Sequence, residues 1–547
     1  MPEILTTNFK SDSARLFVDS LSSDQYYLFV SSIDAFIPEN TQVSKNSFLE
    51  KALFGKRIAG NDINFCIPYY PWQVGSVYVE YDDNVDLTGQ KFYSVVGPND
   101  NDTGDYRIYK CLRNNNGAVT SNPPNYDPAV IDQRYETADG YVWKYMYRLT
   151  TLEFEAYNAA GFIPITGMLD NDPTPAGGGK ISDIVVTNRL ENDGYVAETG
   201  TLLESPDTSG ILTVFPRTSW SPSPDYYNGQ TLYATNPNGV SKIFEIIDYS
   251  YSTATGVAFV RVGPDLVSGV ANPLAAGIVD NASVSILPRV LIEGDGVSSQ
   301  NANYTAVGIP NIINGRIDSI DILEAGEGYT TATVTVVDPQ QDFDPSSVER
   351  TDLRATARAR ISPPGGHGFN LIDELYCRNF SMYAYITADD NNQIGATNTY
   401  GAIGLIRNPS FDGTAPAIFD NRIAITTDDI GNVSVNTTVT QIDSNNKIVF
   451  SGKVHEVDAP NSTFYIAEYM GPYVNNPSTG QGDTSLDLTL SLRNETGQTI
   501  TINSPIASNV TLSPYTQRSG EVYFMENFFP LPRTDLSREE FKIVLEY

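Results

Sequence analysis

The chain is poor in cysteine, and its three cysteines form no metal-binding or disulfide pattern. Cys66, Cys111 and Cys377 are spread over 547 residues, their number is odd, and none belongs to a CxxC pair. We therefore expect neither a disulfide-stabilised framework nor a cysteine-based zinc site. So few cysteines are typical of a protein that is made and folded in a reducing cytoplasm.

Histidine is scarcer still, with only His367 and His455, and no HExxH metal motif is present. His367 lies in the glycine-rich stretch 365–368, which predicts a turn, and His455 lies in a strand-like run. A Ser-His-Asp triad stays open, because its members need not be neighbours in the sequence. Neither histidine has a GxSxG nucleophile motif to serve, so we expect no catalytic residue and predict that the chain is not an enzyme.

Positive charge is also lacking. The chain has 34 lysine and arginine residues against 66 aspartate and glutamate residues, a net charge of -32 at pH 7. Such a surface repels the phosphates of nucleic acids and the headgroups of anionic lipids. We therefore expect no nucleic acid and no membrane as partner, although a local basic patch is compatible with this total.

Long apolar stretches are missing as well. No segment approaches the ~20 uninterrupted apolar residues of a membrane-spanning helix. The first residues, Met1–Thr7, have neither the basic nor the apolar region of a secretory signal. With 547 residues, 40% of them apolar, the chain is long enough for roughly three or four soluble domains, each with its own core.

Two acidic loops resemble calcium-binding loops only in part. In 100–105, Gly104 occupies the fifth position of an EF-hand pattern and Cys111 the twelfth, where oxygen ligands are required. The loop 389–393 is rich in oxygen ligands, but Ile394 follows where the pattern needs glycine. We interpret both as polar turns between strands and predict no metal site.

The sequence also contains no motif for nucleotide binding and none that identifies a glycoside hydrolase. The run 177–180 is followed by Ile181 rather than serine or threonine, and Thr174 stands where a P-loop has its first glycine. Among 66 acidic side chains some pair will always have the separation that a glycoside hydrolase needs, so the sequence alone selects none. We expect no cofactor and no small-molecule substrate.

Helical signal is confined to the N-terminal region. One helix is predicted there, because four apolar residues follow the i, i+3, i+4, i+7 spacing of a helix face, with Ser11 or Asp12 as its cap. These four residues are Ala14, Phe17, Val18 and Leu21. A second short helix is predicted over 47–54, with a capping box at its start and Gly55 at its end.

The remaining sequence alternates with the period of β-strands between turn residues. This predicts a mainly β, multidomain protein of antiparallel β-sandwich or barrel-like domains. In the clearest run, 141–148, one face carries four aromatic residues: Tyr141, Trp143, Tyr145 and Tyr147. We interpret this stripe as core packing, with a carbohydrate platform or a subunit contact as alternatives. Further strands are predicted at 26–30, 76–81, 91–96 and 106–111.

Composition marks three seams between domains. Proline, glycine or small polar residues dominate 170–179, 362–368 and 475–483. These are the places where we expect the chain to pass from one domain to the next.

One internal repeat lies between the first two seams. The segment 179–186, followed by Gly194 and Tyr195, resembles 315–322, followed by Gly328 and Tyr329. Each copy predicts a strand, a glycine turn and a tyrosine that opens the next strand. Two copies suggest a duplicated β unit rather than a solenoid, which needs at least three repeats. Two unrelated hairpins with similar turns are the alternative.

Several segments, taken in their order, resemble one known family. The most specific are DGYVWKY at 139–145 and SGEVYFMEN at 519–527. The other matching segments are 4–11, 27–30, 67–72, 106–112 and 539–545. In these segments the chain is similar to the gene-eight baseplate wedge subunit of T-even-like contractile-tailed bacteriophages. The resemblance covers about 1–165, weakly 366–430, and 515–547.

The resemblance implies a domain arrangement. We expect an N-terminal wedge core domain over 1–165 and a second core β domain made of 366–432 plus 515–547. The segment 166–365, with the duplicated Gly-Tyr unit, is expected to be an inserted β domain, and 433–514 a small inserted β domain. The insertions are expected to make contacts specific to this phage.

The resemblance also implies a function without catalysis. Members of that family are structural proteins of the virion that form a homodimer within each baseplate wedge and contact other wedge proteins. The baseplate rearranges when the tail engages the host, and this triggers sheath contraction. The protein would be synthesised in the host cytoplasm and located in the tail baseplate. The resemblance transfers no catalytic residue and leaves the interface residues unknown.

Two other functions are weighed against this one. A receptor- or glycan-binding tail protein at the host-facing surface would expose aromatic platforms, but no long β-helix repeat and no coiled-coil stem is present. A glycan-degrading tail enzyme would depend on one pair of carboxylates. Both remain open as alternatives.

Overall fold

The structure is a computed structural model, and it describes most of the chain. The described residues are 7–32, 45–98, 104–127, 134–158, 161–165, 179–188, 194–297, 305–337, 355–363, 365–386, 399–442, 447–471, 491–502, 506–532 and 539–546. Over these ranges no helix is long and apolar enough to cross a membrane.

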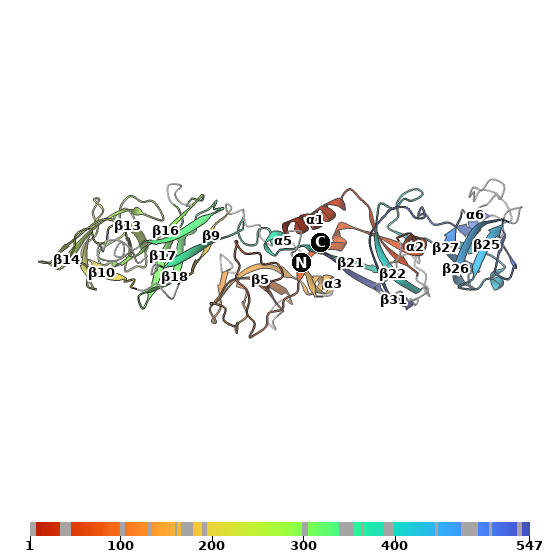
Figure 1. Ribbon diagram of the computed structural model, residues 1–547, viewed down its shortest axis with the longest axis horizontal. Helices are drawn as coiled ribbons and strands as arrows, with labels where there is room; N and C mark the ends of the chain where they lie inside the picture. Colours follow the sequence, from red (N-terminus) through yellow and green to blue (C-terminus); the bar gives the residue numbers. More distant parts are fainter. Residues whose placement is uncertain are drawn as a thin grey trace. The chain divides into compact units, whose positions relative to one another are not determined.

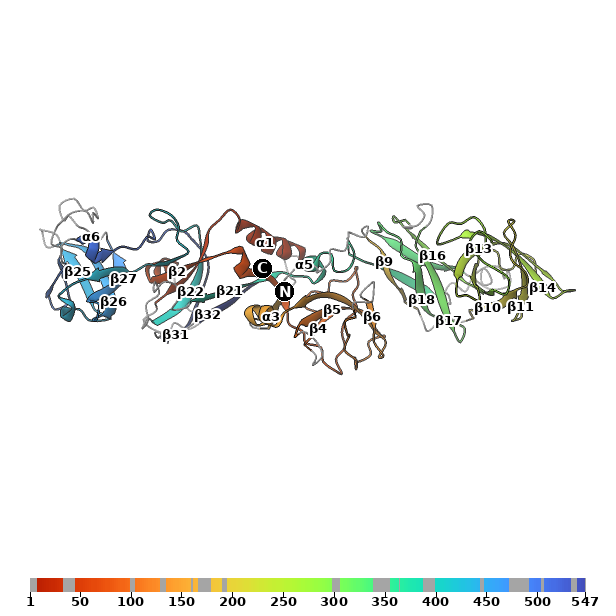
Figure 2. The ribbon, with the colours of Figure 1, turned by 180° about the vertical axis from the view of Figure 1, so that it is seen from behind.

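The chain divides into two compact units, each described here by itself. Unit 1 comprises Met1–Pro68, Leu152–Ile165 and Arg378–Tyr547, and unit 2 comprises Tyr69–Thr151 and Thr166–Cys377. Both consist mainly of antiparallel sheets, as the ribbon shows from two sides (Figures 1 and 2). The prediction of a mainly β, multidomain chain with antiparallel and barrel-like sheets is thus confirmed.

The helices are short. Those in the described residues are α1 (Thr7–Ser20), α2 (Lys45–Glu50), α3 (Thr151–Tyr157), α5 (Leu371–Glu374) and α6 (Ile506–Asn509), with 3-10 turns η1 (Gly60–Asp62) and η3 (Ile430–Asn432). Helix α1 confirms the predicted apolar face, since Ala14 and Phe17 are buried. The predicted cap is wrong: Ser11 and Asp12 lie inside this helix, which already includes Thr7.

The second predicted helix is only half right. Helix α2 ends at Glu50, and the chain continues directly as a strand that contains Gly55. This glycine pairs with Phe29 of the neighbouring strand, and the ring of Phe419 lies where a side chain at position 55 would be. Gly55 therefore provides space for close packing within a sheet instead of ending a helix.

Unit 1 contains two sheets that share one core. The β1 sheet has the order β23 (Ile418–Asp420), β2 (Ala52–Ile58), β1 (Tyr26–Ser31), β22 (Thr399–Arg407), β31 (Glu521–Pro532). The β21 sheet has the order β32 (Glu539–Glu546), β21 (Asn379–Ile386), β3 (Ile63–Pro68), β8 (Phe162–Pro164). Both sheets combine strands from the beginning and from the later part of the chain, so neither region forms its sheet alone.

Strand β1 is the central strand of the five-stranded β1 sheet and is buried along its whole length. Tyr26 and Leu28 face a core shared with α1 and the β21 sheet, whereas Tyr27 and Phe29 face a second core that includes Phe48 of α2. An uninterrupted apolar run such as YYLFVS is typical of a strand that is covered on both faces.

Unit 1 also contains a seven-stranded sheet with its own core. The β26 sheet has the order β29 (Thr499–Thr501), β28 (Ser491–Arg493), β25 (Thr438–Ile442), β26 (Ile448–Asp458), β27 (Thr463–Met470), β24 (Ile423–Thr426), β30 (Val510–Thr511). Its buried cluster includes Phe450, Phe464 and Ile466.

A buried arginine connects the β1 sheet to the β26 sheet. The guanidinium of Arg422 donates to both carboxylate oxygens of Asp420, at 2.9 and 2.7 Å, and to Glu456 at 2.6 Å. It lies 4.3 Å from the ring centre of Tyr465 and 4.9 Å from that of Phe54. Burial alone would lower the pKa of Arg422, but the carboxylates of Asp420 and Glu456 hold it above its usual range.

In unit 2, the first sheet contains the predicted aromatic stripe. The β7 sheet has the order β4 (Tyr93–Val96), β5 (Tyr106–Asn114), β7 (Tyr141–Leu149), β6 (Arg134–Glu136). Tyr141 stacks on Trp143 at 5.5 Å, and both are fully buried, so the interpretation as core packing is confirmed. The strict alternation is wrong, because Met146 is buried as well, and the register shifts between Tyr145 and Tyr147.

The strand predicted at 76–81 is absent from the assigned strands. This segment runs extended beside the β7 sheet with single backbone bonds, among them Val79 N to Lys91 O and Tyr81 N to Cys111 O, each 2.8 Å. Isolated bonds of this kind do not build a ladder.

The second sheet of unit 2 has six strands and contains both copies of the repeat. Its order is β18 (Arg316–Glu324), β17 (Val307–Ile313), β16 (Arg289–Gly294), β19 (Ala332–Val337), β20 (Thr356–Ile361), β9 (Ile181–Val186). The first copy of the repeat consists of β9, Tyr195, β16 and β17. The second copy consists, in the same order, of β18, Tyr329, β19 and β20. The first strand of each copy pairs with the last strand of the other, β9 with β20 and β18 with β17.

The remaining strands of unit 2 form a closed barrel. Its order is β10 (Glu198–Leu202), β11 (Ile211–Pro216), β14 (Val257–Asp265), β13 (Ser241–Ser252), β12 (Thr231–Thr235), β15 (Ser283–Leu287), and β15 pairs back to β10. The barrel has a separate core that includes Trp220, Tyr227 and Phe244. The chain enters it after Tyr195 and leaves it before β16.

Candidate functional site

Several ion pairs lie at the junction between the β7 sheet and the six-stranded sheet of unit 2. Arg360 of β20 is buried there and bonds the carboxylate of Glu80. Its guanidinium also donates to the carbonyl oxygen of Leu112 at 3.1 Å and approaches Asp183 of β9 at 3.5 Å. One side chain therefore holds three segments that are distant in the sequence.

Two further arginines complete this junction. Arg358, two residues before Arg360 on β20, bonds both carboxylate oxygens of Asp82, one of them at 2.7 Å. Arg113 of β5 donates from Nε to Asp183 at 2.8 Å. Burial alone would raise the pKa of Asp82, but the hydrogen bonds from Arg358 and from the Asn84 backbone hold it below its usual range. The pair of Asp82 and Arg358 is thus charged at neutral pH.

The local sequence of β20, TARARI, accounts for this arrangement. Successive side chains of a strand point to opposite faces. Arg358 and Arg360 share the face toward the β7 sheet, whereas Ala357, Ala359 and Ile361 face the core of the six-stranded sheet. Small apolar side chains on one face and arginines on the other let a single strand serve both a core and a charged junction.

A buried ion pair lies next to this junction. Lys110 of β5 donates from Nζ to Glu374 of α5, and both side chains are almost completely buried. The other oxygen of Glu374 accepts the backbone N–H of Gly368 at 2.6 Å. Helix α5 places Glu374 there, because the side chain of Asn370 caps the helix by accepting the N–H of Asp373.

His367 packs against this ion pair. Its ring meets the ring of Tyr81 edge-on at 5.0 Å, and Nδ1 lies 3.6 Å from Glu374 Oε2, beyond hydrogen-bond length. Neither ring nitrogen has a hydrogen-bond partner among the described residues. The glycine-rich segment around His367 therefore does not leave it on an exposed loop, and its side chain is buried.

Burial and mutual interaction set the protonation states of this group. Burial, together with the nearby charge of Lys110, lowers the pKa of His367 to about 4. Burial would raise the pKa of Glu374, but Lys110 and His367 hold it at about 2. Burial also lowers the pKa of Lys110, and Glu374 opposes this shift. At neutral pH the group thus consists of a charged pair and a neutral imidazole.

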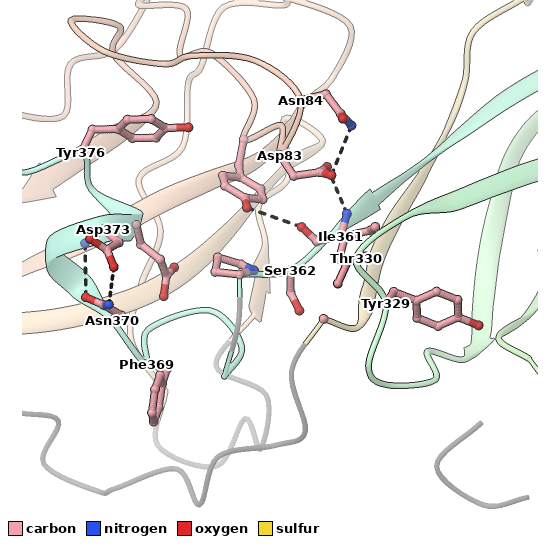
Figure 3. A pocket seen from close by; sticks show the side chains of 14 residues that line it. Asp83, Asn84, Tyr329, Thr330, Ile361, Ser362, Phe369, Asn370, Asp373 and Tyr376 are labelled. Atoms are coloured by element: carbon pink, nitrogen blue, oxygen red, sulfur yellow. Dashed lines mark hydrogen bonds between the residues drawn. The ribbon is translucent and has the colours of Figure 1, made fainter. Parts of the chain in front are cut away.

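Figure 3 shows a pocket of about 540 Å³, whose lining includes Glu374 of the buried pair. Four aromatic side chains and three carboxylates contribute to its lining. These are Tyr81, Tyr329, Phe369 and Tyr376, and Asp83, Asp373 and Glu374.

The carboxylates of this pocket are engaged by donors of the protein itself. Asp83 accepts the N–H of Ile361 at 3.1 Å, and Asp373 accepts the side-chain amide of Asn370 (Figure 3). Glu374 is bonded by Lys110 and Gly368, as described above. All three carboxylates are thus hydrogen-bonded within the protein.

The other candidates from the sequence lie elsewhere. His455 lies on β26 of unit 1. Gly179 accepts the N–H of Tyr329 at 2.9 Å, and the N–H of Lys180 donates to Ser362. Both residues thus belong to the packing of unit 2.

The two acidic loops are not placed by the structure. Residues 100–103 and 387–398 lie outside the described residues, as do most of the seam 170–179 and the seam 475–483. Across the described part of the chain, no group of three or more histidine, cysteine, aspartate or glutamate side chains is arranged to hold a metal ion.

Sequence reasoning missed the buried charges altogether. Lys110 lies in a strand, YKC, whose alternation predicts a polar residue facing solvent, and only the fold shows that α5 covers this position. The arginines of β20 left a readable signal, since two arginines at period two in a strand must share one face. Their partners Glu80, Asp82 and Asp183 are too far away in the sequence to be found from it.

The fold and this junction define a class: a multidomain β protein whose sheets are joined by buried ion pairs. Comparison with known proteins adds no further identification. No family model matches the chain, and no curated protein matches its sequence.

Proposed function

We propose that this chain is a structural subunit of the baseplate wedge of a contractile phage tail. The observation that carries the proposal is the ordered set of sequence segments, above all DGYVWKY and SGEVYFMEN, that resemble the gene-eight wedge subunits. In this proposal the protein acts as a homodimer, contacts other wedge proteins and takes part in the rearrangement that triggers sheath contraction.

The distribution of the sheets supports the proposal. All strands of the β1, β21 and β7 sheets come from the stretches that resemble the family, about 1–165, 366–430 and 515–547. All strands of the six-stranded sheet and the barrel come from 166–365, which has no counterpart there. A family core with insertions would have this distribution, because an inserted segment can form its backbone hydrogen bonds within itself. In the β26 sheet, β24 of the resembling stretch pairs with β27 of the second insertion.

The buried ion pairs are a second line of support. In unit 1, Arg422 connects two sheets through the carboxylates of Asp420 and Glu456. In unit 2, Arg360 of the six-stranded sheet bonds the carboxylate of Glu80 and the carbonyl oxygen of Leu112 in β5. Bidentate and multiply bonded arginines fix geometry more strictly than apolar contacts do. Firm junctions between sheets suit a subunit that must pass a displacement from one neighbour to another.

Gold-labelled antibody against the chain, imaged on virions of the source phage by electron microscopy, tests the proposal. The label is expected at the distal plate of the tail, both before and after contraction. Label along fibres or spikes would favour the receptor- or glycan-binding alternative. Virions without label, when a blot of denatured virions also fails to detect the chain, would overturn the proposal.

A further inference from the structure

The barrel is inserted at a connection that is only two residues long in the other copy of the repeat. In the second copy of the repeat, Tyr329 is connected to the next strand, β19, by only Thr330 and Thr331. At the equivalent position of the first copy, between Tyr195 and β16, the chain instead builds the whole barrel. A closed barrel with its own core, held at a turn, is suited to recognition, because loops and insertions of this kind carry function on a stable scaffold.

The outer wall of the barrel carries four apolar side chains arranged around Thr213. Phe259 of β14 is the cross-strand partner of Thr213. On the opposite edge of β11, the N–H of Leu203 donates to the carbonyl oxygen of Thr213 at 2.9 Å. Ile211 and Phe215 lie two positions before and after it on β11, and thus on the same face. The four side chains have exposed fractions of 53% (Leu203), 42% (Ile211), 41% (Phe215) and 43% (Phe259). We call this surface the Thr213 face.

Two of the three cations of the barrel segment 198–287 border the Thr213 face. The guanidinium of Arg217 lies 5.4 Å from the ring centre of Phe215, and its Nε donates to Thr201 at 3.2 Å. Arg261 is the cross-strand neighbour of Ile211 on one side and of Asp248 on the other. The third cation, Lys242, is paired with Asp265 at 3.3 Å, away from this face.

The chemistry of the Thr213 face distinguishes between classes of partner. A glycan would need several hydrogen-bonding groups for its hydroxyls, but the four apolar side chains offer none, and the hydroxyl of Thr213 already donates to Glu204. An anionic membrane would be repelled by a chain with a net charge of -32. Exposed aromatic and aliphatic side chains beside arginine are typical of the centre of a protein–protein interface.

We propose that the Thr213 face docks a different protein, whose contact surface has an apolar centre and a carboxylate that meets Arg217. Arg217 is the better anchor, because Asp248 faces Arg261 from the adjacent strand, whereas Arg217 forms no ion pair within the described structure. Phe215 and Phe259 supply the apolar contact area, and Arg217 sets the orientation. This proposal is argued from the barrel alone and does not rest on the tail function.

Site-specific photo-crosslinking of the full chain, in the cells that naturally produce it, tests the proposal. A benzoylphenylalanine is placed at Thr213, and as a matched control at Tyr233, a half-buried residue of β12 on the opposite wall of the barrel. We expect one dominant product at Thr213 and at least tenfold less of it at Tyr233. The crosslinked peptide, identified by mass spectrometry, must belong to another protein and lie beside apolar residues and an aspartate or glutamate.

Substitutions within the full chain separate docking from chance proximity. Phe259→Asp is expected to reduce the product at least tenfold, whereas Val240→Asp, at an equally exposed apolar residue outside the face, should change it less than twofold. Arg217→Glu should reduce it similarly, and replacing the partner's carboxylate by lysine should restore it. If Phe259→Asp impairs folding, the loss with Arg217→Glu and its rescue by the partner's lysine still test the proposal.

Several results would overturn the proposal. These are equal crosslinking at Thr213 and Tyr233, no crosslinking at Thr213, a product made of two copies of this chain, a product with polysaccharide, and Arg217→Glu without effect. If purified virions lack the chain but the Thr213 product forms, the tail function fails and the docking surface stands.

Discussion

The backbone N–H of Tyr329 donates a hydrogen bond of 2.9 Å to the carbonyl oxygen of Gly179, and the other copy of the repeat returns the same contact, from Tyr195 to Gly315 at 2.9 Å. The hydroxyls are reciprocal too. Tyr329 accepts the N–H of Ala306 at 2.8 Å, and Tyr195 accepts that of Ala355 at 2.9 Å. Each copy thus donates to and accepts from the other copy in the same way, as two subunits do in a symmetric dimer.

This reciprocity predicts matched effects for two substitutions. Tyr195→Phe should leave the buried N–H of Ala355 without its acceptor, and Tyr329→Phe that of Ala306. An unsatisfied buried donor costs about 1–3 kcal/mol, so each variant should lose a similar free energy of unfolding. Hydrogen exchange should accelerate at Ala355 in the first variant and at Ala306 in the second. A change at neither amide would contradict the pairing.

Removal of the barrel tests its independence from the six-stranded sheet. Joining Tyr195 to Arg289 through two threonines, as Thr330 and Thr331 join the second copy, should leave this sheet folded. The strand pairs of the sheet lie wholly outside the barrel. Amide protection in β9, β18 and β20 is the readout. An excised chain with unprotected amides in these strands would show that the barrel stabilises the sheet.

The buried ion pair predicts a non-additive double substitution. Lys110→Met leaves the carboxylate of Glu374 buried without its charge partner, which costs about 3–5 kcal/mol. Glu374→Gln alone leaves the ammonium in the same situation. The double variant should recover a large part of either loss, because a buried pair can be replaced by neutral groups at little cost. The free energy of unfolding in urea is measured for the original chain, the two single variants and the double variant. If the losses of the two single variants simply add up in the double variant, the coupling is disproved.

The neutral His367 predicts a loss of stability in acid. The folded-state pKa of about 4 lies below the ordinary 6.5, so the unfolded chain binds the extra proton first as the pH falls. The resulting stability is complete above pH 6.5 and is lost between pH 6.5 and 4, on the order of 3 kcal/mol. Glu374, with a pKa of about 2, adds a loss of the same sign below pH 4.5.

His367→Phe isolates this contribution. The variant should keep its stability at pH 7, since the imidazole has no hydrogen-bond partner within the described structure, and it should lose the pH dependence between 6.5 and 4. Thermal unfolding of both proteins across this range is the measurement. An unchanged pH profile in the variant would mean that other groups cause the acid sensitivity.

Arg422 predicts a large effect for a substitution that keeps the charge. Lysine cannot make the bonds to Asp420 and Glu456 at once or lie flat on Tyr465, so Arg422→Lys should cost about 2–4 kcal/mol. Arg518 is the matched control, because its pair with Glu50 is solvent-exposed. Arg518→Lys should cost less than about 1 kcal/mol. Equal denaturation midpoints for the two variants would contradict the assigned role of Arg422.

The fold was predictable from the sequence where the pattern was local. The apolar face of α1, the strand at 26–30 and the aromatic stripe around Trp143 each depend on a pattern within one segment, so the type of element could be predicted from that segment alone. The predicted ends of elements were wrong where a contact with a distant part of the chain determines the local structure. Gly55 was expected to end a helix, but the ring of Phe419, 364 positions away (419 − 55), makes it a strand residue.

The junction was not predictable for the same reason. Lys110 and Glu374 are 264 positions apart and become partners only because α5 covers β5. Arg360 meets Glu80 across 280 positions. A polar residue in a strand normally indicates a solvent-facing position, and the rule fails where a second sheet or a short helix covers that face with an opposite charge.

The central claim, that the chain is a structural part of the tail, is tested most directly by a nonsense mutation in its gene. The source phage is grown with and without a suppressor tRNA, and the particles are imaged and counted by electron microscopy. The account predicts that without suppression no complete tails with a baseplate form. Complete, contractile tails that merely fail to adsorb, or that fail only to degrade host glycans, would contradict it.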